Sequence, residues 1–289
     1  MPLSPILRAC LVLLLVCPGS GPTRAGADVF APPAIKRLVA AYPEAIEEID
    51  EGWLVWRDGS RMQIDDGKGI KSFRAWLDDP DIEDMLRLSY PAGADDVPPP
   101  PEYDPGRARN AAFFDKMYGD CRKGEVKPRL TTVTWLPRKT RQRLEVTTVN
   151  GVAARLAAVS QELDRLPPEF DKFLLPAGGT YNCRVIAGTS RVSAHGYGIA
   201  IDIAVRQSDY WRWAPDALSG NIVYRNRIPL EIVHIFERHG FIWGGRWHHY
   251  DTMHFEYRPE LLPPIAPLER TAPGHSLDNA APNGAPLKK

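Results

Sequence analysis

Most of what this sequence reveals lies in one stretch, Ser193-Ala194-His195-Gly196-Tyr197-Gly198-Ile199-Ala200-Ile201-Asp202. From Ile199 to Val205, large aliphatic residues alternate with small residues and a single carboxylate, Asp202. Because side chains of a strand point alternately to its two faces, this pattern predicts a strand with one apolar face and one face that has room around Asp202. A carboxylate on an inner face is costly to bury unless it is paired or binds a metal. The alternative is a salt bridge from Asp202 to Arg184 or Arg191.

A second segment, Asp251-Thr252-Met253-His254, follows about fifty residues later. Together with the first it offers two imidazoles and one carboxylate, from His195, Asp202 and His254, as well as a spare carboxylate on Asp251. A catalytic zinc ion usually takes three protein ligands of these kinds and leaves its fourth position to water, whereas structural zinc is closed by four. The residue types therefore indicate hydrolytic chemistry.

The two segments have the pattern Ser-x-His-x-x-Gly-x-Ala-x-Asp followed by an acid-x-x-His. This pattern resembles the motif of the zinc D-Ala-D-Ala carboxypeptidase and L-alanyl-D-glutamate peptidase family, which is related to the Hedgehog zinc fold. The resemblance covers roughly Gly178 to Tyr257 and includes Gly244-Gly245-Arg246-Trp247 and His254-Phe255-Glu256. Nothing before Pro128 contributes to it.

The resemblance implies that His195, Asp202 and His254 bind one zinc ion per chain and that Asp251 is the catalytic acid and base. Members that are carboxypeptidases usually have Glu at the latter position, and Asp is more similar to phage-type endopeptidases. The cut bond, terminal D-Ala-D-Ala or L-Ala-D-Glu, therefore stays open.

The resemblance also gives roles to residues around the first motif. It implies that an arginine upstream stabilises the oxyanion, which makes Arg184 the candidate and Arg191 the rival. It further implies that Ser193 helps to hold the substrate. The expected substrate is a peptidoglycan stem peptide. The alternative, from a different functional class, is a zinc-stabilised wall-binding or signalling module without turnover.

Strand alternation raises one difficulty for this assignment. Thr252, His254 and Glu256 would share one face of a continuous strand, and Asp251 would point away from the metal. The proposed role of Asp251 therefore predicts that the chain bends, or that the strand begins, near Thr252.

The composition suits a globular protein and gives no indication of a nucleic-acid partner. The chain has 289 residues, of which 44% are hydrophobic and 25% charged, and its 36 basic residues balance 36 acidic ones. Without an excess of positive charge, neither nucleic acid nor an anionic membrane is expected as a partner. The oligomeric state is left open.

Residues 1–27 have the features of an export signal. Arg8 precedes the apolar run Ala9 to Val16, and Ala25-Gly26-Ala27 fits a cleavage site. The run is shorter than the roughly 20 residues that span a bilayer. We therefore expect a periplasmic or secreted protein without stable membrane insertion, with a retained anchor as the alternative.

The exported chain would keep two thiols, Cys121 and Cys183, because Cys10 and Cys17 lie in the signal. An oxidising compartment favours a disulfide between them over two free thiols. Such a bond would tie the segment before the domain to the residues just upstream of the first motif.

The remaining chain divides at proline-rich stretches. We expect a small N-terminal module over 28–95, a linker over 96–106 containing four consecutive prolines, a peptidase core over 107–258 and a flexible tail over 259–289. Within the module, a helix is predicted around Ile35 to Ile49, and Asp58-Gly59 between two apolar runs predicts a hairpin.

Two helices are predicted in the core. Apolar residues recur at helical spacing from Val152 to Leu166, and Pro229 and Gly240 bracket Leu230 to His239 as a start and stop. The predicted fold class is α+β: a small antiparallel sheet flanked by helices carries the zinc site, next to a small N-terminal module.

Overall fold

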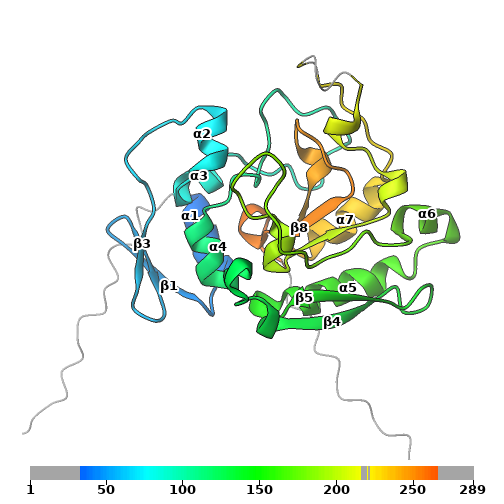
Figure 1. Cartoon of the computed structure of the whole chain (residues 1–289), viewed down its shortest axis with the longest axis horizontal. Coiled ribbons are helices and arrows are strands. Elements are labelled where there is room, and N and C mark those ends of the chain that lie inside the picture. Colours follow the sequence, from blue (N-terminus) through cyan, green and yellow to red (C-terminus); the bar gives the residue numbers. More distant parts are fainter. Residues whose placement is uncertain (1–32, 216–219, 221, 266–289) are drawn as a thin grey trace, which may run out of the picture.

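The computed structural model describes residues 33–215, 220 and 222–265 (Figure 1). Its helices are α1 (Pro33–Ala41), α2 (Phe73–Asp78), α3 (Ile82–Leu86), α4 (Ala111–Tyr118), α5 (Val152–Leu163), α6 (Asp171–Leu174) and α7 (Leu230–Arg238). Its strands are β1 (Ile46–Asp50), β2 (Trp53–Trp56), β3 (Arg61–Gln63), β4 (Leu130–Trp135), β5 (Gln142–Thr147), β6 (Ala200–Asp202), β7 (Phe241–Trp243) and β8 (His254–Tyr257). All strand pairs of the described residues are antiparallel, and this mixture with helices is an α+β fold.

The N-terminal residues form a sheet of order β1-β2-β3. The predicted hairpin is confirmed, since β2 and β3 pair with Leu54 opposite Met62. The predicted helix over Ile35 to Ile49 is wrong in its second half, where β1 pairs with β2 instead. Pro43 explains the difference, because a proline disfavours helical geometry in the residue before it and removes a helix hydrogen bond.

Helix α4 connects this sheet to the rest of the molecule. Its Phe113 contacts Tyr42 edge to face at a centroid distance of 5.4 Å, and its Phe114 packs on Tyr197 at 5.5 Å. Tyr42 in turn donates a hydrogen bond of 2.7 Å to the buried Glu260. The two parts share one hydrophobic core, and the division of the chain into domains stays a prediction.

The segment 96–106 contains no helix or strand, and its C-terminal end, where Asp104, Pro105 and Gly106 are buried, lies against the core. Trp247 donates its indole N–H to the carbonyl of Pro105 at 2.8 Å, and His248 donates its amide to the carbonyl of Tyr103 at 3.0 Å. Asp104 is fully buried and accepts from the ring of His249 at 2.8 Å. These contacts fix the C-terminal end of the segment, whereas the four consecutive prolines before it are exposed or half-buried.

The C-terminal half contains the two predicted helices. Helix α5 packs on the β4–β5 hairpin and buries Val152, Leu156, Val159 and Leu163, so its prediction is confirmed up to Leu163. Helix α7 begins after Pro229 and ends at Arg238, just before Gly240, as predicted. It packs against a three-stranded sheet through Phe236, which stacks on Phe255 at a centroid distance of 3.8 Å.

This sheet has the order β6-β8-β7, which places β8 in the centre. The predicted strand from Ile199 to Val205 is shorter than expected and covers Ala200–Asp202. The reason is the partner, because β8 begins at His254, opposite Asp202, and beyond it only one bond, from the Ile203 amide to the Met253 carbonyl, continues the pairing. The chain then enters a 3₁₀ helix at Val205–Gln207.

The predicted signal at 1–27 lies outside the described residues, as does most of the predicted tail, from 266 onward. Within the described part, none of the helices is long and apolar enough to cross a membrane.

Candidate metal centre

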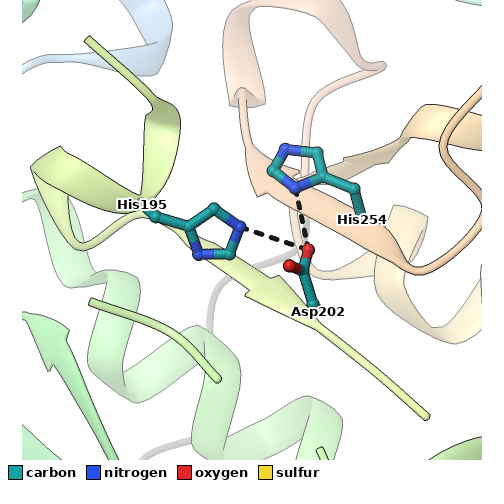
Figure 2. Close-up of side chains that lie close together, drawn as sticks. All are labelled: His195, Asp202 and His254. Atoms are coloured by element: carbon teal, nitrogen blue, oxygen red, sulfur yellow. Dashed lines mark hydrogen bonds and ion pairs between the residues drawn. The ribbon is translucent and has the colours of Figure 1, made fainter. Parts of the chain in front are cut away.

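His195, Asp202 and His254 converge on one point (Figure 2). The same carboxylate oxygen, Asp202 Oδ1, lies 3.2 Å from His195 Nε2 and 3.1 Å from His254 Nδ1. The three potential ligand atoms lie within 4.8 Å of one another, so they could hold a metal ion. Asp202 therefore pairs with the two histidines and not with Arg184 or Arg191.

Strand register and a tight turn produce this convergence. Asp202 and His254 are directly opposite in the β6–β8 pair, and such partners have close Cβ atoms. His195 lies in the 3₁₀ helix Ala194–Tyr197, which ends at Gly198 with φ of 69°. A side chain at Gly198 would also approach the Thr147 amide nitrogen to 3.0 Å, so the residue allows both the turn and the close packing on β5.

The remaining nitrogen of each imidazole is held by an acceptor. His195 Nδ1 lies 2.5 Å from the Thr180 carbonyl oxygen, and His254 Nε2 lies 3.1 Å from Glu256 Oε2. With its proton on the nitrogen that faces the acceptor, each ring turns a lone pair toward Asp202. Metal-binding histidines characteristically have such second partners, which fix the tautomer and the ring orientation. The donor set thus fits a metal.

Glu256 is fully buried and is itself supported by two arginines. Arg109 Nη1 lies 3.0 Å from Oε2, and Arg258 Nη1 lies 3.1 Å from Oε1. Burial by itself would raise the pKa of Glu256, but Arg109 leads the opposing influences, which hold it well below its usual range. Sequence reasoning placed Glu256 on the face of His254 without giving it a role, and it missed Thr180 and Arg109.

Negative charge is concentrated around the buried imidazoles. Burial would lower the pKa of His254, but its hydrogen bonds to Asp202 and Glu256 raise it to about 10. Burial by itself would raise the pKa of Asp202, but the hydrogen bonds with His195 and His254 outweigh this effect and lower it. Both shifts favour positive charge between these groups, which is the condition that a bound cation would satisfy.

Asp251 is separated from β8 by a turn, and the strand begins only after that turn, at His254, as the expected role of Asp251 requires. Thr252 and Met253 form a turn, and the His254 amide donates to the Asp251 carbonyl at 3.2 Å. Asp251 Oδ1 is buried and has no hydrogen-bond partner among the described residues. Burial is the main cause that raises the pKa of Asp251 to about 6.

The other predicted site residues lie on the segment before the first motif. Arg184 is exposed and its carbonyl accepts from the Ser193 amide at 3.0 Å, while Ser193 is buried. The guanidinium of Arg184 forms no ion pair with a described residue. Arg191 is less exposed, at 18% of its side chain, and its Nε lies 3.3 Å from Asp78 Oδ1.

Cys121 and Cys183 are joined by a disulfide bond, with their Cα atoms 5.6 Å apart. The bond lies directly against the first motif, because a side chain at Gly196 would meet Cys121 Sγ at 3.2 Å. The neighbouring Asn182 amide donates to the His195 carbonyl at 3.1 Å. The disulfide therefore anchors the segment that supports His195.

Comparisons with known proteins give one result. Residues 187–257 match the model of a family described as D-alanyl-D-alanine carboxypeptidase. No curated protein matches the chain. No solved structure matches it either.

The matched segment contains His195, Asp202, Asp251 and His254, the residues that carry the resemblance. At the level of the family, the match supports a peptidase of cell-wall peptides. The resemblance to the zinc D-Ala-D-Ala carboxypeptidase family is thereby confirmed over residues 187–257.

Proposed function

We propose that this chain is an exported zinc metallopeptidase that hydrolyses peptidoglycan stem peptides. The observation that carries the proposal is the meeting of His195, Asp202 and His254 at one point, with the second nitrogen of each ring already bound to an acceptor. Three ligand groups of these kinds are typical of a catalytic zinc site, whereas a zinc ion that only stabilises a fold is usually bound by four. The family match supports the peptidase class.

Zinc is the proposed ion because two imidazoles and one carboxylate form a frequent catalytic zinc set. In such a site zinc makes water acidic enough to serve as a nucleophile near neutral pH and polarises a carbonyl. His195 and His254 supply neutral ring nitrogens, and Asp202 supplies the charge. Glu256 orients His254 and holds the proton of its Nε2.

Asp251 is the proposed general base and acid. A base needs a free acceptor atom and a pKa close to the working pH. Asp251 has both, since its buried Oδ1 is without a hydrogen-bond partner among the described residues and its pKa lies near 6. The carboxylate would take the proton of the attacking water and hand it to the leaving amine.

Arg184 remains the proposed oxyanion-stabilising residue and Ser193 the proposed substrate contact. The exposure of Arg184 is compatible with a group that meets the scissile carbonyl only when a peptide is bound. Arg191 remains its rival for this role.

The scissile bond is proposed to be either the terminal D-Ala-D-Ala or the L-Ala-D-Glu bond. Asp251 in place of Glu favours the second, and the description of the matched family favours the first. The N-terminal module is proposed as an accessory subdomain of a periplasmic or secreted enzyme, packed on residues 107–258.

Mass spectrometry of muropeptides incubated with the zinc-loaded protein tests this proposal. Loss of one alanine would identify a carboxypeptidase, and cleavage before D-Glu would identify the endopeptidase. Intact muropeptides across a broad panel, with zinc bound, would reject the enzyme and favour a wall-binding or signalling module.

A further inference from the structure

A cavity of about 210 Å³ shares the wall residue Arg109 with the support of the metal centre, since Arg109 also donates to Glu256. Its walls come from residues 78–80 at the end of α2, from residues 107 and 109–112, and from Arg191, Val192 and Tyr197. Three arginines line it, Arg107, Arg109 and Arg191, and we call it the arginine pocket. Arg107 and Arg109 lie outside the segment that matches the peptidase family.

Three arginines and two carboxylates, Asp78 and Asp79, line the arginine pocket. Two of the arginines are also paired with carboxylates outside the lining, Arg107 with Asp104 at 3.3 Å and Arg109 with Glu256 at 3.0 Å. Asp79 is engaged by Lys68 at 2.8 Å, and Asp78 is shared between Arg74 at 3.5 Å and Arg191 at 3.3 Å. The first turn of α4 also lines the cavity, and a helix N-terminus adds partial positive charge.

Arg191 is the clearest sign of a missing acceptor. Its buried Nη1 has no hydrogen-bond partner among the described residues, and its buried Nε, although 3.3 Å from Asp78 Oδ1, makes no hydrogen bond either. Leaving buried donors without an acceptor costs free energy, more so when the group is charged. Burial, and next the charge of Arg109, lower the pKa of this guanidinium, with further repulsion from Arg107 and Arg212. An anion in the cavity would relieve this repulsion.

The cavity is connected to the metal centre through two of its walls. Arg109 donates to Glu256, which holds His254. Val192 and Tyr197, which line the cavity, stand on either side of Ser193 to His195 in the chain. A peptide in the proposed active site would therefore have one end close to these arginines.

We propose that the arginine pocket binds a carboxylate of the peptide substrate and thereby sets which bond reaches the metal centre. A guanidinium presents paired N–H donors that match a carboxylate, and such charge-assisted bonds are strong when shielded from water. The inference rests on the proposed function. A stem pentapeptide with lysine at its third position offers two sources of this chemistry, the terminal D-Ala carboxylate and the free carboxylate of D-Glu.

The test compares three synthetic stem pentapeptides: one with both carboxylates free, one amidated at the terminal D-Ala and one amidated at D-Glu. Arg191→Gln removes the guanidinium from the pocket, and Arg191→Lys keeps the positive charge without the paired N–H donors. Arg165→Gln is a matched control on an exposed arginine. Zinc content and thermal melting establish that each variant is folded and loaded.

We expect Arg191→Gln to raise KM for the free peptide about tenfold or more with kcat little changed, and Arg191→Lys to have a smaller effect. For one of the two amidated peptides, the parent enzyme should already show the raised KM, because the carboxylate that the pocket binds is missing. Arg191→Gln should not raise the KM for that peptide any further. That peptide identifies the carboxylate. Arg165→Gln should behave as the parent.

The same peptides are also titrated calorimetrically, so that the inference is tested without turnover. If the parent cleaves the free peptide but Arg191→Gln changes KM equally for all three peptides, or for none, the pocket inference is overturned and the proposed function stands. The pocket inference is overturned as well if Arg191→Gln lowers kcat for all three peptides alike, because that result would assign Arg191 to the oxyanion. If the parent cleaves nothing, the proposed function fails. The pocket would still be supported if the parent binds the free peptide more tightly than one of the amidated peptides and Arg191→Gln abolishes this difference in affinity. Equal affinity of the parent for all three peptides would reject the pocket.

Discussion

Asp202 and His254 face each other across the β6–β8 pair, and Oδ1 of the first lies 3.1 Å from Nδ1 of the second. The register of two short strands thus places a carboxylate beside a buried imidazole whose other nitrogen is held by Glu256. Since His195 reaches the same oxygen, one atom of Asp202 is the centre of the proposed site.

Asp202→Asn should abolish stoichiometric zinc binding. The amide is neutral and cannot supply the charge that the proposed site needs between two imidazoles. Metal analysis of purified protein should give about one zinc per parent chain and almost none for the variant. Asp209→Asn, which removes a carboxylate paired with Arg227 at 3.0 Å, is the matched control and should keep its zinc. Full occupancy in Asp202→Asn would remove this residue from the ligand set.

Glu256→Gln should weaken zinc binding about tenfold to a hundredfold, because residues that orient metal ligands have effects of this size. It should also lower the free energy of unfolding by about 3–5 kcal/mol, since Arg109 and Arg258 would lose a buried partner. Chelator competition measures the first effect and denaturant unfolding the second. An unchanged zinc affinity would contradict the role given to Glu256.

Asp251→Asn should keep zinc and lose about a hundredfold to ten-thousandfold in kcat, the usual contribution of a general base. The parent rate should fall as the pH drops below about 6, because the protonated carboxyl cannot accept a proton. The residual rate of the variant should not show this decrease at low pH. A rate unchanged by the substitution would eliminate Asp251 from the mechanism.

The same variant should be more stable than the parent when both are free of metal. Burial raises the pKa of Asp251 in the folded state from 3.8 to about 6, so the folded protein binds the proton more tightly than the unfolded chain. The ionised carboxylate therefore destabilises the fold progressively above pH 3.8 and fully above about 6. At pH 7 the gain from Asn should be roughly 1–3 kcal/mol. Equal unfolding midpoints at pH 7 would indicate that Asp251 has an ordinary pKa.

Replacing Cys121 and Cys183 by Ser should cost about 2–4 kcal/mol of unfolding free energy. Zinc affinity should fall as well, since the bond anchors the segment that contacts the His195 carbonyl through Asn182. Unfolding curves with and without reductant measure the effect. Reductant should shift the parent curve and leave the double variant unchanged; a parent insensitive to reductant would argue against the bond.

The features that could be predicted from the sequence are those with a local signal. Helix α7 has a proline before it and a glycine after it, and the β2–β3 hairpin contains Asp58-Gly59. The metal motif consists of two short sequence segments. The helix predicted over Ile35 to Ile49 was wrong beyond Pro43, because the pairing of β1 with β2 outweighs a weak helical pattern.

The surroundings of the metal centre depend on long-range contacts that have no local signature. Arg109 reaches Glu256 across 147 residues, and the Thr180 carbonyl that holds His195 is a backbone atom of a loop. Nor could spacing choose among the arginines. Only the folded chain separates the exposed Arg184 from Arg191, which lies in a crowded cationic cavity.

The proposed function requires that one zinc ion is bound by His195, Asp202 and His254. Crystals of the zinc-loaded protein, measured on both sides of the zinc absorption edge, would locate this ion. A single strong anomalous peak is expected at about 2.0–2.2 Å from His195 Nε2, His254 Nδ1 and an oxygen of Asp202. A peak bound by other residues, or no peak between these three side chains in crystals soaked with zinc, would contradict the proposed function.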